Sequence, residues 1–281
     1  MNLAPPRPAP PDLAADARLL TAAVRDAGAV ALDYFHRGAR FWDKAANDPV
    51  SEADLAVDAS LQAALAGSRP DYGWLSEEGE DDPRRLACQR TWVVDPIDGT
   101  RAFLKGRDTF VVSAALVERG RPVAAAIFRP VTGDLFTAER GAGARLNDAP
   151  IKAPATDRLE DAAVLGDAGL FRSERLWPVP WPAVRCSGGY NAIALRICLV
   201  AAGAFDATVS LRPTNDWDLA AAELILEEAG GVCVSHMAGP HAYNTAKPKP
   251  PFVVAAAAGL EHSIMKRMVP ALVRGDARPR D

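Results

Sequence analysis

The chain lacks the features that mark several classes of protein. Its four cysteines are scattered and form no C-x-x-C pair, so the sequence suggests neither a zinc site nor a disulfide framework. The 32 Lys and Arg residues are outnumbered by 36 Asp and Glu, which leaves a formal charge of −4 and no basic surface for nucleic acid. No apolar run is long and uncharged enough to cross a bilayer.

The first twelve residues hold five prolines and lack an apolar core, unlike a signal peptide. We expect residues 1–12 to form a disordered, Pro-rich lead. The absence of a disulfide pattern predicts reduced thiols in a cytoplasmic protein. With 281 residues the chain can bury a sizeable core. A polar stretch near residues 153–158 predicts two parts, 13–153 and 154–281.

The first part has the pattern of helices packed on an antiparallel sheet. Apolar residues at helical spacing predict a helix from Leu13 to about Phe35. A capping motif at residues 51–54 opens a second helix, whose predicted apolar face holds Leu55, Leu61 and Leu65. Strands are predicted at residues 73–75, 92–94, 109–118, 122–128, 135–138 and 144–146.

The second part alternates strands and helices. Strands are predicted at residues 162–165, 205–211, 232–235 and 252–256. Helices are predicted at residues 190–202, 218–229 and 260–273. Glycines directly after the first two of these helices act as stop signals.

The most informative segment runs from Trp92 to Thr100 and reads WVVDPIDGT. An apolar strand end delivers Asp95 and Asp98 at a bend, followed by the backbone amides of Gly99 and Thr100. Carboxylates bind hard cations, and amides at a helix start bind phosphate. The segment therefore offers both halves of a metal-assisted phosphate site. The plain alternative is a turn that uses Asp and Gly as turn formers.

Three further acidic segments fit the same site, although each has an ordinary explanation. Asp54 could only cap its helix, and Asp218 could only complement a helix dipole. Glu77 and Glu78 could belong to a solvated loop. As a set, these oxygen ligands suit magnesium rather than zinc. None of the four histidines has a catalytic context.

Taken in order, these segments resemble the motifs of the inositol monophosphatase superfamily, from the first helix to the last. The matching residues are Ser76-Glu77-Glu78, Asp95-Pro96-Ile97-Asp98-Gly99-Thr100, Gly141-Ala142-Gly143-Ala144, Asn147, Trp217-Asp218-Leu219-Ala220-Ala221-Ala222 and Glu228-Ala229-Gly230-Gly231. Two long motifs in order make a specific signal. The resemblance implies an α+β fold, a layered α-β-α-β-α sandwich of the sugar-phosphatase type with an antiparallel N-terminal sheet and a mixed C-terminal sheet.

The resemblance also implies roles for the site residues. Two or three magnesium ions are expected per site, with Glu77, Asp95 and the Ile97 carbonyl at the first ion and Asp95, Asp98 and Asp218 at the second. The expected catalytic residues are Asp54, Glu77 and Thr100, which orient the attacking water. The expected substrate-binding residues are Asp98, Gly99, Thr100, Arg101 and Asp218. Glu78 is expected to support its loop.

Smaller features favour one branch of the superfamily. Arg101-Ala102-Phe103 is similar to the basic-x-Phe pattern of the 3'(2'),5'-bisphosphate nucleotidases, as are the segments 81–85, 212–215 and 243–244. Inositol phosphatases place a ring-binding glutamate before the Trp-Asp pair, and here no glutamate lies between Asp206 and Trp217. The branch implies hydrolysis of adenosine 3',5'-bisphosphate to AMP. The alternatives are an inositol-1-phosphate or histidinol-phosphate phosphatase, or a regulatory partner-binding protein of the family.

The residues around the substrate leave further alternatives open. Arg101, Arg212 and Lys247 could meet a second phosphate or belong to solvated surface. Tyr190 could stack on a base, but core packing is the preferred interpretation. It lies where the family usually has Gly-Ser before a helix. The expected partner is a small phosphorylated substrate, with no nucleic acid and no membrane span, and a homodimer is common in the family.

Overall fold

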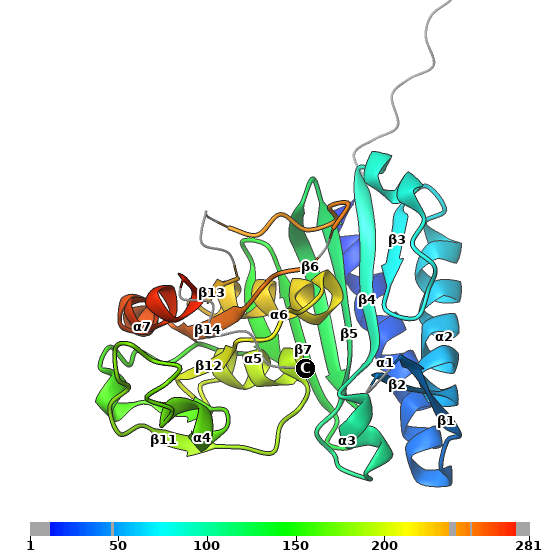
Figure 1. The fold of residues 1–281 in the computed structure, drawn as a ribbon. Coiled ribbons are helices and arrows are strands. Elements are labelled where there is room, and N and C mark those ends of the chain that lie inside the picture. The colour runs from blue at the N-terminus through cyan, green and yellow to red at the C-terminus, as the bar shows by residue number, and fades with distance from the viewer. Residues whose placement is uncertain (1–11, 46–47, 236–239, 248, 274–281) are drawn as a thin grey trace, which may run out of the picture.

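The fold is a stack of five layers, seen from the side in Figure 1. The computed structural model describes residues 12–45, 48–235, 240–247 and 249–273. A helix pair covers one face of a seven-stranded sheet, and a second pair separates that sheet from a five-stranded sheet. A further helix covers the outer face of the five-stranded sheet. The expected α+β sandwich is confirmed.

The bounds of the elements agree with most of the predicted segments. The N-terminal elements are α1 (Leu13–Arg37), β1 (Phe41–Ala45), β2 (Asp48–Ser51), α2 (Glu52–Ser68), β3 (Gly73–Ser76), β4 (Arg90–Asp98), α3 (Thr100–Leu104), β5 (Val111–Glu118), β6 (Arg121–Arg129), β7 (Asp134–Glu139), β8 (Gly143–Leu146) and β9 (Ala149–Pro150). The C-terminal elements are β10 (Ala163–Leu165), α4 (Ala168–Phe171), β11 (Arg185–Ser187), α5 (Ile193–Ala201), β12 (Ala207–Ser210), α6 (Asp216–Glu228), β13 (Gly231–Val234), β14 (Val253–Ala257) and α7 (Glu261–Val273). Short 3-10 helices lie at Pro83–Ala87, Leu159–Asp161 and Ala258–Leu260.

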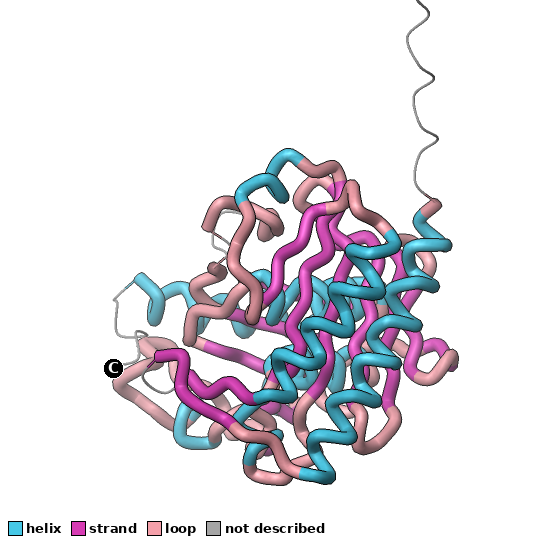
Figure 2. The backbone as a smooth tube through the Cα atoms, turned by 90° about the vertical axis from the view of Figure 1, so that its right-hand side faces the viewer, coloured by secondary structure: helices cyan, strands magenta, loops and turns pink. Residues whose placement is uncertain are grey.

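Helices α1 and α2 lie side by side across one face of the large sheet (Figure 2). The predicted cap of α2 is confirmed, because the Ser51 hydroxyl accepts a hydrogen bond from the Ala53 amide. Leu61 and Leu65 are buried as predicted. The prediction for Leu55 is wrong: it is 44% exposed, because its position on the helix points away from the sheet. The predicted lead lies outside the described residues except Asp12, which caps α1.

The large sheet has the strand order β3-β4-β5-β6-β7-β8-β9. Its neighbours run antiparallel except at one edge, where β3 pairs parallel with β4. Side chains along β5 point alternately to the two faces of the sheet, so this strand contributes to two hydrophobic cores. Val112, Ala114 and Leu116 face α1 and α2, whereas Val111, Ala115 and Val117 face α5 and α6. This strand is apolar on both faces because both faces are covered.

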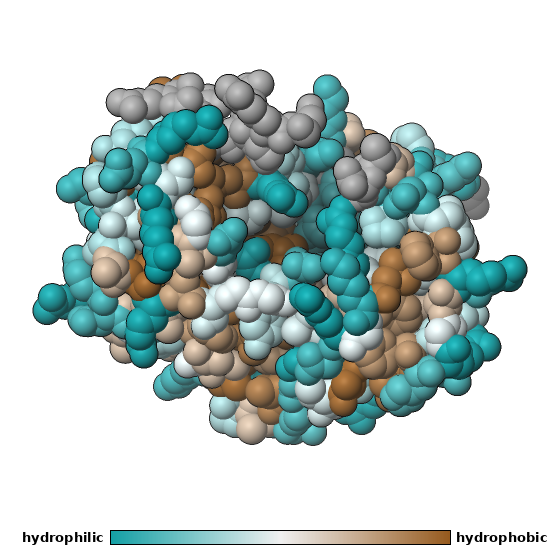
Figure 3. Space-filling view, turned by 60° about the horizontal axis from the view of Figure 1, so that its bottom comes forward, coloured by the Kyte–Doolittle hydropathy of each residue, from teal (hydrophilic) through white to brown (hydrophobic). Residues whose placement is uncertain are grey.

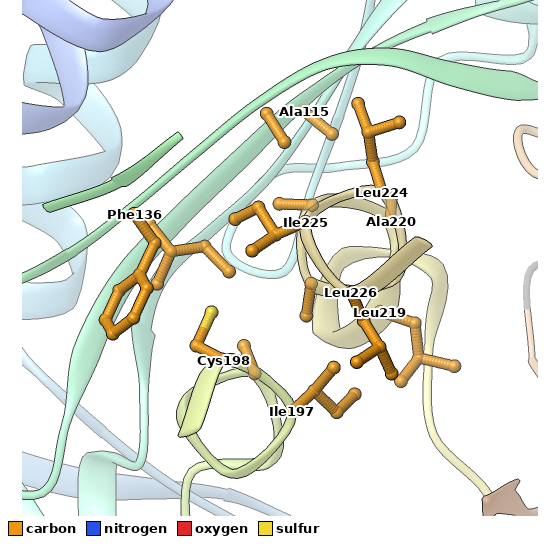
Figure 4. Packing of buried hydrophobic residues seen from close by; sticks show 14 of the residues in the cluster. Ala115, Phe136, Ile197, Cys198, Leu219, Ala220, Leu224, Ile225 and Leu226 are labelled. Carbon is orange, nitrogen blue, oxygen red and sulfur yellow. The ribbon is translucent and has the colours of Figure 1, made fainter. Parts of the chain in front are cut away.

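Helices α5 and α6 form the middle layer. Figure 4 shows Ile197 and Cys198 of α5 and Ile225 of α6 packed together beside Phe136 of the large sheet. Both helices carry alanine and leucine on nearly every side because sheets lie above and below them. This layer places the first turn of each helix next to the end of β4.

The smaller sheet is mixed, with the order β11-β10-β12-β14-β13. Strand β10 runs parallel to β11 and β12, and β14 runs antiparallel to β12 and β13. Val253 and Ala255 face the middle helices, whereas Val254 and Ala256 face α7. The prediction that helix 190–202 begins at Tyr190 is wrong. The helix begins at Ile193, and Ala192 is extended.

A carboxylate ties two of the family motifs together. Glu228, at the end of α6, accepts hydrogen bonds from the amides of Gly141 (2.8 Å) and Gly143 (2.9 Å). These glycines have φ angles of +80° and +81°, a backbone that glycine adopts without strain. The division into 13–153 and 154–281 stays a prediction. Within the described helices, no segment has both the length and the apolar character of a membrane span.

Candidate active site

A β-bulge at the end of β4 places two carboxylates on one side of the strand. Asp95 pairs with Ser113 and Asp98 pairs with Val111, so β4 has one residue more than β5 in this interval. In a regular strand, residues three apart point to opposite faces. The extra residue turns Asp98 to the side of Asp95. Oxygens of Asp95, Asp98 and Asp218 all lie within 4.8 Å of one another.

The first turn of α5 fixes Asp98. The Asp98 carboxylate accepts hydrogen bonds from the Ile193 amide (3.2 Å) and the Ala194 amide (2.6 Å). These are amides without a partner inside the helix, at its positive end. The distant carboxylate replaces a local cap, which explains why α5 starts later than its sequence pattern predicts.

Asp218 comes from the first turn of α6. Its Oδ2 accepts a 2.6 Å hydrogen bond from the amide of Asn215, the N-cap residue. Asp218 therefore acts as a capping residue at the positive end of α6, where the plain explanation expected it to complement the helix dipole. The cap fixes the carboxylate, and one of its oxygens belongs to the cluster with Asp95 and Asp98.

Thr100 and Asp54 meet beside the bulge. The Thr100 hydroxyl lies 3.1 Å from Asp54 Oδ1 and 3.1 Å from the Ile97 carbonyl oxygen. The other oxygen of Asp54 accepts hydrogen bonds from the Ser51 amide (2.8 Å) and hydroxyl (2.6 Å). Gly99 has a φ of +96°, and a Cβ there would lie 3.1 Å from the Thr109 carbonyl. Only glycine fits this bend without strain.

Glu77 and Glu78 follow β3 and differ in their contacts. The Glu77 amide donates to the Val94 carbonyl (3.3 Å), which extends the parallel pairing with β4. The ammonium of Lys44 lies 2.8 Å from Glu78 Oε1 and 3.5 Å from Glu77 Oε1. Glu78 thus forms an ion pair with Lys44 of strand β1, and its expected support of its own loop stays a prediction. Lys44 was not predicted as a contact of these carboxylates, because the sequence pattern did not indicate the β1–β2 hairpin that carries it.

The carboxylates of the site have raised pKa values when no cation is bound. Burial and then the charge of Asp218 raise the pKa of Glu77 to about 7. Burial raises the pKa of Asp218 to about 6, against the hydrogen bonds from Asn215. Burial and neighbouring carboxylates raise the pKa of Asp95 and that of Asp98 well above the usual range. Such crowding is typical of a cation site.

The donor set fits a hard cation. Asp95 Oδ1 is buried and has no hydrogen-bond partner among the described residues. An orphaned buried carboxylate oxygen needs a positive partner. The available atoms are all oxygens, which suits magnesium. Because Asp95 and Asp98 lie on β4 and Asp218 lies on α6, the fold itself holds these carboxylates together.

A small cavity of about 170 Å³ opens over these groups. It is lined by Asp48, Pro49, Glu77, Asp95, Ile97, Asp98, Gly99, Thr100, Arg101, Asn191 and Asp218. Figure 3 shows a hollow near the centre of the face that it presents, with hydrophilic residues around it. A larger cavity of about 580 Å³ lies between α1 and β7–β8, away from the carboxylates.

The structure brings nearly all the predicted site residues together. Eight of them line the cavity: Glu77, Asp95, Ile97, Asp98, Gly99, Thr100, Arg101 and Asp218. Asp54 joins them through Thr100. Tyr190 packs edge-on against Phe205, at 6.4 Å between ring centroids, as the packing interpretation expects. Asn191, which lines the cavity, was not singled out from the sequence.

The model of the inositol monophosphatase family matches residues 12–274. The chain belongs to the inositol monophosphatase family. An inositol-1-monophosphatase of Rhizobium meliloti (strain 1021) is 38% identical over 193 residues, which cover 66% of this chain and 71% of the relative. A Nus factor SuhB of Pasteurella multocida (strain Pm70) is 33% identical over 239 residues, covering 82% and 85%.

A solved structure shares the fold. The extragenic suppressor protein suhB of Bartonella henselae superposes with a TM-score of 0.74 at 28% identity, covering 89% of this chain and 96% of that one. Family and relatives together indicate a phosphoric monoester hydrolase.

Proposed function

We propose that this phosphatase is magnesium-dependent and hydrolyses adenosine 3',5'-bisphosphate to AMP and phosphate. Glu77, Asp95 and the Ile97 carbonyl would hold one ion, and Asp95, Asp98 and Asp218 a second. Bound magnesium would supply a nucleophilic water and neutralise charge on the reacting phosphate.

The remaining residues of the site position the reactants. The Thr100 hydroxyl is oriented by Asp54 Oδ1 and the Ile97 carbonyl, so it can hold the attacking water in line with phosphorus. Burial raises the pKa of Asp54, which suits it to take a proton through Thr100. The amides of Gly99 and Thr100 would hold the phosphate oxygens.

One observation supports a substrate with a second anionic group. Arg196 of α5 is partly buried, and its guanidinium donates to the Thr208 hydroxyl (2.8 Å) and to the carbonyls of Leu165 (3.1 Å) and Val209 (2.9 Å). All three acceptors are neutral, and no carboxylate of the described residues lies within 4.0 Å of it. Burial lowers its pKa to about 10, and the charge of Asp98 opposes that shift.

A buried cation without a carboxylate partner is costly unless a ligand balances its charge. Arg196 lies on the helix that holds Asp98, and Arg101 lines the cavity itself. An inositol ring would offer neutral hydroxyls to Arg196, whereas a second phosphate would offer a negative charge. The absence of a ring-binding glutamate between Asp206 and Trp217 also favours a bisphosphate over an inositol phosphate as the substrate.

A substrate panel tests the proposal, with released phosphate as the measurement. The panel holds adenosine 3',5'-bisphosphate, inositol 1-phosphate and histidinol phosphate, each with saturating magnesium. The expected result is the highest kcat/KM for the bisphosphate. Preference for either monophosphate would reject the specificity, and no turnover of any ester would favour the regulatory alternative.

Variants of the two arginines sharpen the test. Arg196→Met should raise KM for the bisphosphate by about tenfold or more, whereas Arg196→Lys keeps the charge and should lose less. Arg101→Ala should weaken hydrolysis of the bisphosphate more than that of a simple monophosphate. Equal losses on all substrates would place Arg101 in a general role.

A further inference from the structure

A carboxylate of helix α2 lies against the end of β3 without a cation beside it. Asp58 is one helical turn after Asp54, on the same side of α2, and it is partly buried. It accepts a 2.5 Å hydrogen bond from the Ser76 hydroxyl. Among the described residues, no Lys, Arg or His nitrogen lies within 4.0 Å of this carboxylate. Burying a charge without a cationic partner is costly, so the contact with Ser76 calls for an explanation.

The hydrogen bond fixes the direction of the Ser76 hydroxyl. An ionised carboxylate only accepts, so Ser76 donates its single hydrogen to Asp58. The lone pairs of the Ser76 oxygen are then left for the backbone amide of Glu78, which lies 3.3 Å away. Because Ser76 is buried, water competes little for these contacts. Asp58 thus determines how the turn after β3 is closed.

Glu77 lies in the middle of this turn. Its own amide donates to the Val94 carbonyl at 3.3 Å, and the Glu78 amide donates to Ser76 at the same distance. Both distances are long for an N–H···O hydrogen bond. The bond between Asp58 and Ser76 is the shortest of the three at 2.5 Å, and hydrogen bonds to an ionised group are roughly twice as strong as neutral ones. It is therefore the strongest hydrogen bond of the three that hold the turn.

We infer that Asp58 is a positioning residue, which raises the affinity of the site for magnesium by fixing the turn that carries Glu77. The inference rests on the magnesium dependence in the proposed function and goes beyond it by assigning a role to a residue outside the family motifs. Helix α2 then serves the site twice, through Asp54 at the Thr100 hydroxyl and through Asp58 at the turn of Glu77. Groups that hold metal ligands in place typically contribute about ten- to a hundredfold to metal affinity.

Magnesium titration by calorimetry, without substrate, tests the inference directly. Asp58→Ala removes the acceptor and should raise the magnesium dissociation constant about tenfold, while kcat at saturating magnesium stays within about twofold of wild type. Asp58→Asn keeps an oxygen that can accept from Ser76, so the increase should be about threefold at most. Glu80→Gln is the matched control, because it removes an exposed carboxylate from the same loop, and should leave the dissociation constant unchanged.

A double-mutant cycle shows whether Asp58 acts through Ser76. Ser76→Ala should weaken magnesium binding by about the same factor as Asp58→Ala, and the double variant should bind no more weakly than either single variant. A merely structural role of Asp58 in α2 would give additive losses and would lower kcat even at saturating magnesium. Far-ultraviolet circular dichroism checks the fold of each variant. If Asp58→Ala does not fold, an unchanged dissociation constant in Ser76→Ala overturns the inference by itself.

The outcomes separate this inference from the proposed function. Unchanged magnesium affinity in folded Asp58→Ala, additive losses in the cycle, or an equal loss in Glu80→Gln would overturn only the role of Asp58. A wild-type protein that binds no magnesium would overturn both. Preference for a monophosphate in the substrate panel would reject only the bisphosphate specificity, because magnesium binding is measured without substrate.

Discussion

The carboxylate of Asp98 accepts a 2.6 Å hydrogen bond from the amide of Ala194, a residue 96 positions later in the chain. A proposed metal ligand on β4 is thereby also the N-terminal cap of α5. The large sheet and the middle helices consequently meet at one side chain. Substitutions in the first turn of α5 are expected to alter the position of Asp98, even though α5 supplies no carboxylate to the cluster.

Replacing Asp98 by Asn should abolish turnover while the protein stays folded. The amide removes one negative charge from the cation site but keeps an oxygen that can accept from α5. We expect kcat/KM to fall at least about a thousandfold, because several kcal/mol of transition-state stabilisation are lost. Phosphate release and far-ultraviolet circular dichroism are the two measurements. Near wild-type turnover at saturating magnesium would remove Asp98 from the mechanism.

The magnesium requirement should fall as pH rises from about 5.5 to about 7.5. Without a cation, Glu77 with a pKa of about 7 and Asp218 with a pKa of about 6 hold protons that magnesium must displace. Raising the pH removes those protons, so half-saturation needs less magnesium. Calorimetric titration in two buffers of different ionisation enthalpy should also show proton release. A pH-independent affinity without proton release would contradict the coupling.

Calcium should bind and inhibit. Its larger radius and looser coordination displace the attacking water from its line with phosphorus. We expect calcium to raise the melting temperature, as magnesium does, while turnover decreases. Excess chelator should abolish activity and remove both stabilising effects. Full activity in the chelator would exclude a metal-dependent reaction.

Glu223 should make the folded protein less stable at high pH. Its side chain is 3% exposed and accepts a 2.6 Å hydrogen bond from the Tyr243 hydroxyl, and burial raises its pKa from 4.5 to about 7. Because the pKa is raised in the folded state, the free energy of unfolding that depends on protonated Glu223 is fully present below pH 4.5. It is lost as pH rises through 7. The loss should be on the order of 3 kcal/mol.

Glu223→Gln should therefore flatten the free energy of unfolding, from denaturant titrations, between about pH 5 and pH 8. Glu227→Gln, on the same helix but more exposed, removes one of the charges that raise the pKa of Glu223 and should reduce the slope only in part. A wild-type slope in Glu223→Gln would show that other groups cause the pH dependence.

Local patterns were enough to predict most of the layered fold and most of the lining of the site. The segment from Trp92 to Thr100 carries its bend, its carboxylates and its glycine in one stretch, so spacing alone brought Asp95 and Asp98 together. The cap of α2 placed Asp54 for the same reason. The place of Asp218 in the site was predicted from the family resemblance, because a helix pattern does not show which sheet the helix packs on.

The predictions that were wrong or absent concern contacts between segments that are distant in the sequence. The start of α5 is set by Asp98, which its own sequence does not contain. The β1–β2 hairpin carries exposed residues throughout β1 and so shows no burial pattern. Lys44, Asn191 and Arg196 look like ordinary polar residues until the fold brings them near the carboxylates.

Arg85 depends on a residue that is synthesised much later. Its guanidinium is buried, and it donates to Asn244 Oδ1 (2.6 Å), 159 residues further along the chain, and to Asp81 (2.5 and 2.9 Å). The backbone amide of Asn244 in turn donates to Asp216 Oδ2 (2.6 Å) at the start of α6. On the ribosome, Arg85 must stay hydrated until that segment emerges, because burying a half-satisfied charge is costly. The loop after Glu77 therefore reaches its full set of contacts only once residue 244 has been synthesised.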